Sequence, residues 1–346
     1  LTAQVTGDHE RVNRVCAHLL ADPHIDQLIV RYGSVQGAKG EAWARGLAAV
    51  AEGSDKPLLI AWSRVPDRTE ASIRILEAHR IPWLLTPTRA ANAAGALYQF
   101  ARKRERLVAR AGRPFSRLIE SRALELPARA GPLSEHESKR YLAAYGIPIT
   151  REVLLAPEAI GRLQQPPLPF PLAVKIDSPD IAHKTEAGAV RLDVQSMGAL
   201  KRAAEAVLTA ARNHNPHARI NGILVSEMAE GEQVIIGAVR DRFFGPVVMF
   251  GLGGVHAELL KDVVYRFAPF DIETAREMIH AIRAHPLLTG YRGRPPLALD
   301  TLAEALTRVS LLAADHAERI ATLDINPLFV NATAVAAADA LIVLQE

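Results

Sequence analysis

Short apolar runs alternate with amphipathic segments in the first third of the chain, and this alternation limits the folds that residues 1–107 can adopt. LLIAW at Leu58–Trp62 is apolar at every position, as expected of a strand buried on both faces. Strands that alternate with helices pair in parallel through right-handed crossovers. We therefore predict a small doubly wound α/β domain, with helices at 10–20, 41–52, 69–79 and 90–106 and strands at 27–31, 58–62 and 83–86. It has no GxGxxG fingerprint, so dinucleotide binding is not predicted.

A second domain is predicted to begin at residue 132, after a linker at 108–131. Proline and glycine interrupt the basic and weakly periodic linker. Ser134 and Glu137 have the spacing of a capping box, and Gly146 stands where a helix commonly ends. DRFFG at 241–245 predicts a hairpin turn. Further segments are predicted as strands at 171–174, 188–194, 223–228, 233–240, 247–250, 323–330 and 336–344, and as helices at 197–213, 273–284 and 302–320.

Charge and cysteine content exclude several classes of protein. The net charge of +3 comes from 41 basic and 38 acidic residues that are interleaved along the chain, so neither nucleic acid nor a membrane surface is expected as a partner. Cys16 is the only cysteine, which excludes an intrachain disulfide and favours a reducing, cytoplasmic compartment. No apolar run reaches membrane-spanning length and no signal peptide is evident. The chain begins at Leu1 rather than methionine, from which we expect a fragment or a processed chain.

The stretch KIDSPDIAHKTEAGAV, residues 175–190, concentrates the polar chemistry of the second domain. Lys175 ends an apolar run, a Ser-Pro-Asp turn follows, and His183, Lys184 and Thr185 come next. Ammonium groups, a hydroxyl and loop amides can together hold a polyphosphate. Taken alone, the same residues are also consistent with a solvated strand flank and a surface histidine.

Other groups of the second domain suit a nucleotide with a divalent cation. A strand end can present backbone groups to an adenine edge, and an acidic side chain can accept hydrogen bonds from ribose hydroxyls. Glycine lets the backbone approach a ligand closely, and oxygen ligands suit a hard cation. The residues concerned are Glu227, Met228 and Ala229 for adenine, Glu232 for ribose, Gly251, Gly253 and Gly254 for close approach, and Asp324, Asn326 and Asp339 for the cation. Each feature alone is a weak signal, since GLGG and an Asn-Pro pair after a strand are both more often ordinary turns.

The order of these motifs, continuing through GLGGVHAELLKDV, GYRGRPP, LDINPL and DALIVL, closely resembles NDP-forming acyl-CoA synthetases, which are relatives of succinyl-CoA synthetase. The resemblance covers residues 128–346 densely and residues 1–107 more loosely. It implies the fold class: a flavodoxin-like doubly wound parallel domain (1–107, a CoA-ligase domain), followed by an ATP-grasp domain (132–346) built from two α+β subdomains. The family reaction is acyl-CoA + ADP + phosphate to acid + ATP + CoA, reversible, through an acyl phosphate and a phosphohistidine.

The resemblance also implies roles for individual residues. His183 matches a histidine that is phosphorylated in turn, and Lys175 matches a lysine that contacts nucleotide phosphates. The remaining matches are Lys184 and Thr185 on the loop over the phosphates, Glu227, Met228 and Ala229 at the adenine hinge, Glu232 at the ribose, Gly253, Gly254 and Glu258 bordering the site, and Asn326 and Asp339 as Mg²⁺ ligands with Asp324 beside them.

One departure from the family pattern limits what the chain is expected to do. The family also needs a CoA-binding Rossmann domain and a second ligase domain with another phosphorylated histidine, and neither is evident in this sequence. We expect these modules upstream or on a separate subunit, and we expect a homo-oligomer. Two other functions stay open: a nucleotide-sensing regulatory module of a protein acetyltransferase, and another ATP-grasp enzyme such as a carboxylate–amine ligase. The acyl substrate is not identified.

Overall fold

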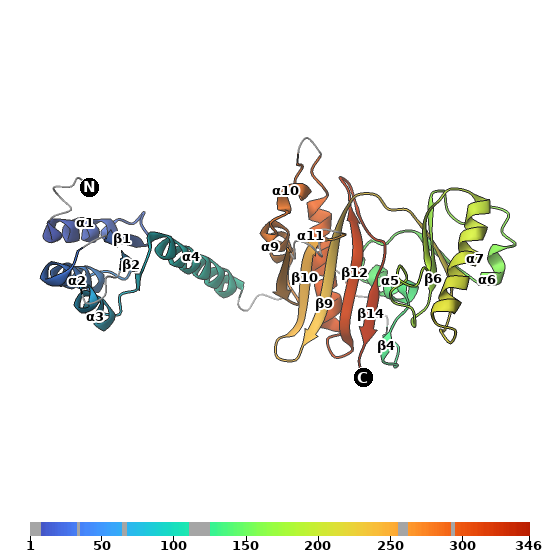
Figure 1. The fold of residues 1–346 in the computed structure, drawn as a ribbon, viewed down its shortest axis with the longest axis horizontal. Helices are drawn as coiled ribbons and strands as arrows, with labels where there is room; N and C mark the ends of the chain where they lie inside the picture. The colour runs from blue at the N-terminus through green and yellow to red at the C-terminus, as the bar shows by residue number, and fades with distance from the viewer. Residues whose placement is uncertain (1–7, 33–34, 64–67, 111–124, 255–261, 292–294) are drawn as a thin grey trace. The chain divides into compact units, whose positions relative to one another are not determined.

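The computed structural model describes residues 8–32, 35–63, 68–110, 125–254, 262–291 and 295–346. The chain divides into two compact units, Leu1–Pro114 and Phe115–Glu346, which we call unit 1 and unit 2 (Figure 1). We describe each unit by itself. Among the helices of the described residues, none combines the length and hydrophobicity needed to cross a membrane.

Unit 1 is built on a sheet with the strand order β1-β2-β3, and its strands pair in parallel, as predicted. Every residue of the central strand is buried, which agrees with its wholly apolar sequence. The last helix is longer than predicted, because Pro87 is accommodated in its first turn and no glycine or proline interrupts it after Gly95. The elements are α1 (His9–Ala21), β1 (Leu28–Tyr32), α2 (Gly37–Glu52), β2 (Leu58–Trp62), α3 (Glu70–Ala78), β3 (Trp83–Leu84) and α4 (Pro87–Arg110).

The first half of unit 2 contains a four-stranded antiparallel sheet with the order β5-β8-β6-β7. Helix α7 packs on β6 and β7 with its buried Leu200, Ala203, Ala204 and Val207 (Figure 1). The elements are α5 (Glu135–Ala144), β5 (Glu152–Leu155), α6 (Pro157–Ile160), β6 (Leu172–Asp177), β7 (Val190–Val194), α7 (Met197–His214) and β8 (Gly222–Glu227).

The other part of unit 2 contains a seven-stranded sheet with the order β11-β10-β9-β12-β14-β4, in which β13 also pairs with β12. The short strand β4 comes before α5 in the sequence, and the other strands follow β8. Helices α9 and α11 pack against each other and against this sheet (Figure 1). Their buried side chains are part of the largest core cluster. The elements are β4 (Gly131–Pro132), β9 (Glu232–Asp241), β10 (Gly245–Leu252), β11 (Val263–Phe267), α9 (Ile272–Ala281), α10 (His285–Leu288), α11 (Leu299–Asp315), β12 (Ile320–Val330), β13 (Val335–Ala337) and β14 (Leu341–Leu344).

Local signals in the sequence of unit 2 are confirmed. Ser134 and Glu137 form the predicted capping box, and Gly146 has a φ of +71° just after helix α5. The predicted hairpin turn joins β9 to β10, where the Asp241 carboxylate accepts from the backbone N–H groups of Phe243 and Phe244. These features depend on neighbours in the sequence, which is why a reading of the sequence finds them.

Among the element boundaries that differ from the prediction, three have a clear structural reason. Strand β6 runs on to Asp177, because Lys175, Ile176 and Asp177 pair with β8. The helix predicted for 302–320 ends at Asp315, since β12 begins at Ile320. The predicted strand 336–344 is two strands, β13 and β14, with residues 338–340 between them. Asp339 therefore lies on a short connection between strands rather than within a strand.

Candidate functional site

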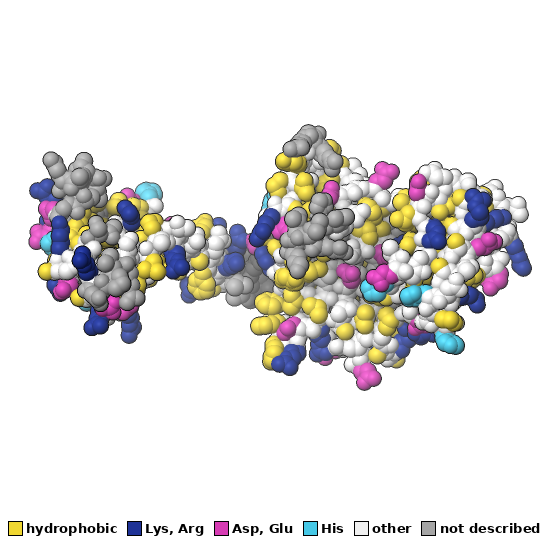
Figure 2. Space-filling model, viewed as in Figure 1, with side chains coloured by type: hydrophobic (Ala, Val, Ile, Leu, Met, Phe, Trp, Pro, Cys, Tyr) yellow, Lys and Arg dark blue, Asp and Glu magenta, His cyan; other side chains and the backbone are white. Residues whose placement is uncertain are grey.

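A pocket of about 410 Å³ lies between the two sheets of unit 2. On the face of unit 2 in Figure 2, acidic and histidine side chains gather over the region where the four-stranded and seven-stranded sheets adjoin. The lining residues come from β6, the loop before β7, strand β12 and the connection into β14. They are Lys175, Ala182, His183, Lys184, Thr185, Glu186, Val190, Asp324, Asn326, Asp339, Ala340 and Leu341.

Two lysines carry positive charge to this pocket from different elements. Lys175 lies on β6 and Lys184 on the following loop, and each side chain is more than nine-tenths buried. Lys175 Nζ donates to Glu135 Oε1 and to the carbonyl oxygen of Ala338, both at 2.7 Å. Lys184 Nζ lies 3.0 Å from Glu135 Oε2 and 3.4 Å from Asp339 Oδ1. One carboxylate therefore contacts both lysines, through a different oxygen for each.

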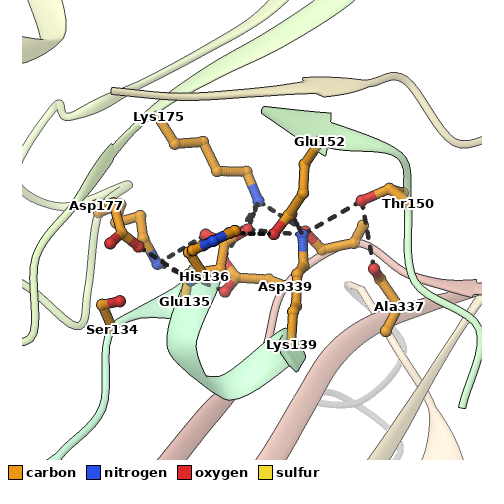
Figure 3. A network of polar contacts seen from close by, with 12 residues as sticks. Ser134, Glu135, His136, Lys139, Thr150, Glu152, Lys175, Asp177, Ala337 and Asp339 are labelled. Atoms are coloured by element: carbon orange, nitrogen blue, oxygen red, sulfur yellow. Dashed lines mark hydrogen bonds and ion pairs between the residues drawn. The ribbon is translucent and has the colours of Figure 1, made fainter. Parts of the chain in front are cut away.

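Glu135 is fully buried and also contacts a third lysine (Figure 3). Lys139, one turn later on α5, approaches Glu135 Oε1 at 2.9 Å and Glu152 Oε2 at 2.9 Å. Burial favours the neutral form of Glu135, but the ammonium groups of Lys175, Lys139 and Lys184 outweigh it and hold the pKa of this carboxyl well below its usual value. Burial likewise opposes the charge of Lys184, yet Glu135 and Asp339 raise its pKa. In this cluster the carboxyl group of Glu135 is therefore ionised and the amine of Lys184 is protonated.

Helix α5 is fixed at its N-terminal end, and this places Glu135. Glu135 is the first residue of α5, directly after the Ser134 cap. The next backbone N–H, that of His136, donates to Asp177 Oδ1 at 3.0 Å, so the last residue of β6 caps the helix from outside (Figure 3). Asn221 Nδ2 donates to the other oxygen of Asp177 at 3.0 Å. Strand β6 and helix α5 are thereby joined next to the pocket.

His183 is exposed and lies on the pocket wall. The turn that follows it is held by its own backbone: the N–H of Ala187 donates to the carbonyl oxygen of His183 (3.2 Å), and the N–H of Ala189 donates to that of Lys184 (2.8 Å). Upstream, the Asp180 carboxylate accepts from the guanidinium of Arg219 at 2.6 and 2.9 Å. The histidine therefore sits on a short segment anchored on both sides.

Asp324, Asn326 and Asp339 bring side-chain oxygen atoms to the pocket from β12 and from the connection into β14. On β12, Asp324 and Asn326 point to one face while Leu323 and Ile325 are buried on the other, the alternation expected of a strand. Burial raises the pKa of Asp324, and the nearby Asp339 raises it further. Burial and the charge of Glu135 raise the pKa of Asp339 despite its neighbouring lysines. Crowded carboxylates of this kind are stabilised by a cation.

The donor set suits a hard divalent cation that is shared with a ligand. Within the described ranges, no group of three or more His, Cys, Asp or Glu side chains is placed to hold a metal ion by itself. The carboxylates of Asp324 and Asp339 line the pocket together with the side-chain amide of Asn326. Mg²⁺ is commonly bound by one or two carboxylates together with substrate phosphates and water. These residues therefore fit Mg²⁺ when a polyphosphate supplies the remaining oxygens.

The residues predicted to bind adenine and ribose do not line this pocket. Glu227 ends β8, and its carboxylate is held by Arg151, with Oε1 accepting from the backbone N–H at 2.9 Å and Oε2 from Nε at 2.6 Å. The N–H of Met228 donates to the carbonyl oxygen of Pro171 at 3.4 Å. Ala229 and Glu232 are half-buried, on the connection to β9 and at its first residue. The chain crosses from one sheet to the other here.

The glycine-rich segment after β10 packs against protein rather than facing the pocket. Gly253 donates its N–H to the carbonyl oxygen of Gln233 at 2.7 Å, and an added Cβ would lie 3.1 Å from that oxygen. Gly254 has a φ of +61° and faces the Gln233 side chain. Glu258, predicted to border the site, lies outside the described residues.

Sequence reasoning missed the acidic centre of the site. Glu135, Lys139 and Glu152 were not predicted, although Glu135 contacts both pocket lysines and Lys139 joins Glu135 to Glu152. A signal was present: Glu135, Ser138, Lys139 and Leu142 recur at helical spacing and form the buried face of α5. Charged residues at core positions of an amphipathic helix indicate a buried ionic network.

Together these groups can bind a polyanion with a divalent cation and present a nucleophile to it. Two ammonium groups and a hydroxyl face the space from one wall, oxygen donors from the other, and an exposed imidazole borders both. A neutral imidazole nitrogen is a good nucleophile toward phosphorus.

Comparisons with known proteins agree with this chemistry. Residues 126–344 match a family described as ATP-grasp domain. The beta subunit of ADP-forming acetate–CoA ligase I from Pyrococcus furiosus is 39% identical over 214 residues, which are 62% of this chain and 92% of that subunit. Acetate–CoA ligase (ADP-forming) I of Archaeoglobus fulgidus is 34% identical over 287 residues, which are 81% of this chain and 41% of that protein.

A solved structure gives a third comparison. The acetyl-coenzyme A synthetase 1 of Ca. Korarchaeum cryptofilum, in complex with coenzyme A and Mg-AMPPCP, superposes with a TM-score of 0.52 at 36% identity, and the match covers 61% of this chain and 93% of that chain. In that structure the phosphohistidine segment is described as pointing towards the nucleotide-binding site.

Proposed function

This chain belongs to the ATP-grasp family of ADP-forming acyl-CoA synthetases, and from that premise we infer that it is the nucleotide-binding, phosphoryl-transferring part of such an enzyme. The observation that carries the inference is the convergence of Lys175, Lys184, His183 and the oxygen donors of β12 and Asp339 on one pocket. These side chains come from two sheets and from sequence positions more than 150 residues apart.

We propose that His183 exchanges a phosphoryl group with the nucleotide. An imidazole nitrogen attacks the γ-phosphorus of ATP, the bond from that phosphorus to the β–γ bridging oxygen breaks, and ADP leaves with the bond electrons. In the reverse direction, ADP attacks phosphohistidine and regenerates ATP. Lys175 and Lys184 offset the charge on the phosphates, and Thr185 can donate its hydroxyl to them. The exposure of His183 on a short loop supports this role.

Asp324, Asn326 and Asp339 would hold Mg²⁺, which when bound would neutralise charge on the phosphates. The raised pKa values of both carboxyl groups support this assignment, because each carboxylate gains from a nearby cation.

For the nucleoside we propose the crossing between the two sheets. Backbone groups of Glu227, Met228 and Ala229 would meet the adenine edge and Glu232 the ribose, with Gly253, Gly254 and Glu258 at the border. Because Arg151 already occupies the Glu227 carboxylate, the adenine contact falls to main-chain atoms. This follows from the position of the segment at the end of β8 beside β9.

The CoA half of the reaction is proposed to lie in other modules. The chain spans less than half of the single-chain relative from Archaeoglobus fulgidus but most of a subunit named beta in Pyrococcus furiosus. A CoA-binding domain and a second ligase domain would therefore lie upstream in the same polypeptide or on a separate subunit. We assign residues 1–107 as a flavodoxin-like ligase domain, joined by a linker at 108–131 to the ATP-grasp domain at 132–346. Self-association into a homo-oligomer stays a prediction.

The proposal is tested by labelling the chain with γ-labelled ATP and Mg²⁺. We expect label that is stable in base, labile in acid and absent from His183→Asn. The matched control is His214→Asn, a change at a histidine at the end of α7 that does not line the pocket. Calorimetric titration with Mg·ADP should give the same affinity for His183→Asn as for wild type. Lys175→Met should bind at least about tenfold more weakly, since a hydrogen bond to a charged group is lost.

Other outcomes separate the competing functions. Label that persists in His183→Asn would contradict the phosphohistidine assignment. Nucleotide binding without labelling would favour a sensing module, and release of ADP that depends on an added amine would favour a carboxylate–amine ligase. Absence of nucleotide binding in the wild-type chain would refute the proposal as a whole.

A further inference from the structure

Among the described carboxylates, Glu135 makes the shortest contacts to the two lysines of the pocket. Its Oε1 lies 2.7 Å from Lys175 Nζ and its Oε2 lies 3.0 Å from Lys184 Nζ. Asp339 also approaches both amines, but at 3.7 and 3.4 Å. Glu135 does not line the pocket, whereas both lysines do. It therefore acts on the pocket only through the side chains that it holds (Figure 3).

A network of buried polar side chains holds the Glu135 carboxylate in place. Lys139 lies one turn along the same helix and binds Glu135 Oε1, while Glu152 on β5 binds Lys139 (2.9 Å). Thr150 Oγ1 accepts from Lys139 Nζ at 3.2 Å and lies 3.4 Å from the carbonyl oxygen of Ala337, to which it donates. A fully buried carboxylate held from several sides has little freedom to change its position.

The lysines differ in how firmly the backbone places them. Lys175 is inside strand β6, so its position follows from the ladder with β8. Lys184 is on a loop and directly follows His183. The described contacts of its ammonium group are Glu135 and Asp339. The contact with Glu135 is the shorter and involves a residue that is not a proposed metal ligand.

We propose that Glu135 is a positioning residue for phosphoryl transfer. Through Lys175 and Lys184 it sets the separation of two phosphate-binding charges, and through Lys184 it fixes the loop that carries His183. The other anchor of this loop, Asp180 with Arg219, is on the surface, where an ion pair is weak. The effect on phosphoryl transfer rests on the proposed function. The anchoring of the loop does not, because it is a property of the chain without nucleotide.

The anchoring is tested without nucleotide by hydrogen exchange and mass spectrometry on the turn after His183. The amides of Ala187, Gly188 and Ala189 donate within this turn and report on its closure. In Glu135→Gln these amides should exchange at least about tenfold faster than in wild type, because a charge-assisted contact is lost. Glu152→Gln is the matched control: it removes a carboxylate from the same cluster that contacts Lys139 and His136 but neither pocket lysine.

Lys184→Met provides a second variant that leaves Glu135 paired with Lys175 and Lys139. It should accelerate the same amides, and it carries the test if Glu135→Gln does not fold. Unchanged exchange in the folded Glu135→Gln, or in Lys184→Met if only that variant folds, would overturn the inference. So would equal acceleration in Glu152→Gln, because the effect would then belong to the whole cluster.

A kinetic readout separates positioning from general stability. At saturating Mg·ATP, the labelling rate of His183 should fall at least about tenfold in Glu135→Gln. Glu135→Asp, which keeps the charge with a shorter reach, should recover part of this loss, and Glu152→Gln should stay near wild type. Failure of the wild-type chain to bind nucleotide would refute the proposed function but leave the exchange result intact, so the two failures are distinguishable.

Discussion

Replacing Gly231 by alanine should destabilise unit 2 more than the same change at Gly245, a second glycine of positive φ. Gly231 precedes β9 and has a φ of +142°, a conformation that other residues rarely adopt. A Cβ at this position would overlap the carbonyl oxygen of Val330 and lie 2.7 Å from its carbonyl carbon. Val330 is fully buried and pairs with Glu232 across β12 and β9, so the backbone cannot move aside without breaking the ladder.

The magnitude follows from comparison with a second glycine. Gly245 in the β9–β10 turn has a φ of +73°, but nothing lies within 4 Å of its added Cβ. Gly245→Ala should therefore cost only the conformational strain, about 1–2 kcal/mol. Gly231→Ala adds an overlap with fixed backbone, which we place at about 2 kcal/mol in the range known for overpacked cores. For a unit of this size the extra cost corresponds to a Tm lower by about 4–8 °C.

Differential scanning calorimetry of both variants measures this difference. All three tryptophans, Trp43, Trp62 and Trp83, lie in unit 1, so a thermal transition without a counterpart in tryptophan fluorescence belongs to unit 2. If Gly231→Ala lowers the temperature of that transition by no more than Gly245→Ala does, the close approach of Gly231 to Val330 is absent from the folded protein and the prediction is wrong.

Two further predictions concern charge. Arg219 holds the pKa of Asp180 down to about 2, so the pair stabilises the fold above the unfolded pKa of about 3.9 and ceases to do so as pH falls toward 2. Arg219→Ala should therefore lower stability only slightly at neutral pH, as for other surface pairs. Denaturant titrations should find a smaller difference from wild type as pH falls below 4, and a difference that stays constant would rule out the ion pair as its cause. Asp324→Asn should reduce the gain in ADP affinity that Mg²⁺ provides by at least about tenfold and leave metal-free binding unchanged, whereas Asp193→Asn, at an exposed carboxylate on β7, should alter neither in calorimetric titrations.

The elements that the sequence predicts well are those specified by residues close together in the chain. LLIAW predicts strand β2 with its bounds, since five consecutive apolar residues cannot be left in water. The capping box of α5 and the turn at Asp241 are satisfied by side chains two or three residues away. Boundaries that depend on a distant partner are less accurate. The end of β6 at Asp177 is set by pairing with Gly222, and nothing next to Asp177 indicates it.

The residues that line the pocket together are found from the sequence in part for the same reason. Lys175, His183, Lys184 and Thr185 fall within one motif, and the structure places them on one pocket with Asp324, Asn326 and Asp339. Glu135 is not predicted from the sequence because it stands in the first turn of a helix with a capping box formed by Ser134 and Glu137. Acidic residues are common in such a turn. Only its burial beside three lysines distinguishes it, and burial depends on the packing of α5 against β6 and β14.

Glu135 changes how the charge of the pocket is understood. The sequence alone suggests that the ammonium groups of Lys175 and Lys184 are unpaired and available to bind phosphate. In the structure, the ammonium groups of Lys139, Lys175 and Lys184 face an equal number of carboxylates from Glu135, Glu152 and Asp339. A polyphosphate that binds to such a balanced cluster must replace a carboxylate in its contacts with the lysines. Asp339 makes the longest of these contacts, at 3.4 and 3.7 Å, and it alone of the three carboxylates lines the pocket. The lysines can therefore turn from Asp339 to phosphate while Glu135 keeps them in place, and the carboxylate thus freed is one that we assign to the metal ion.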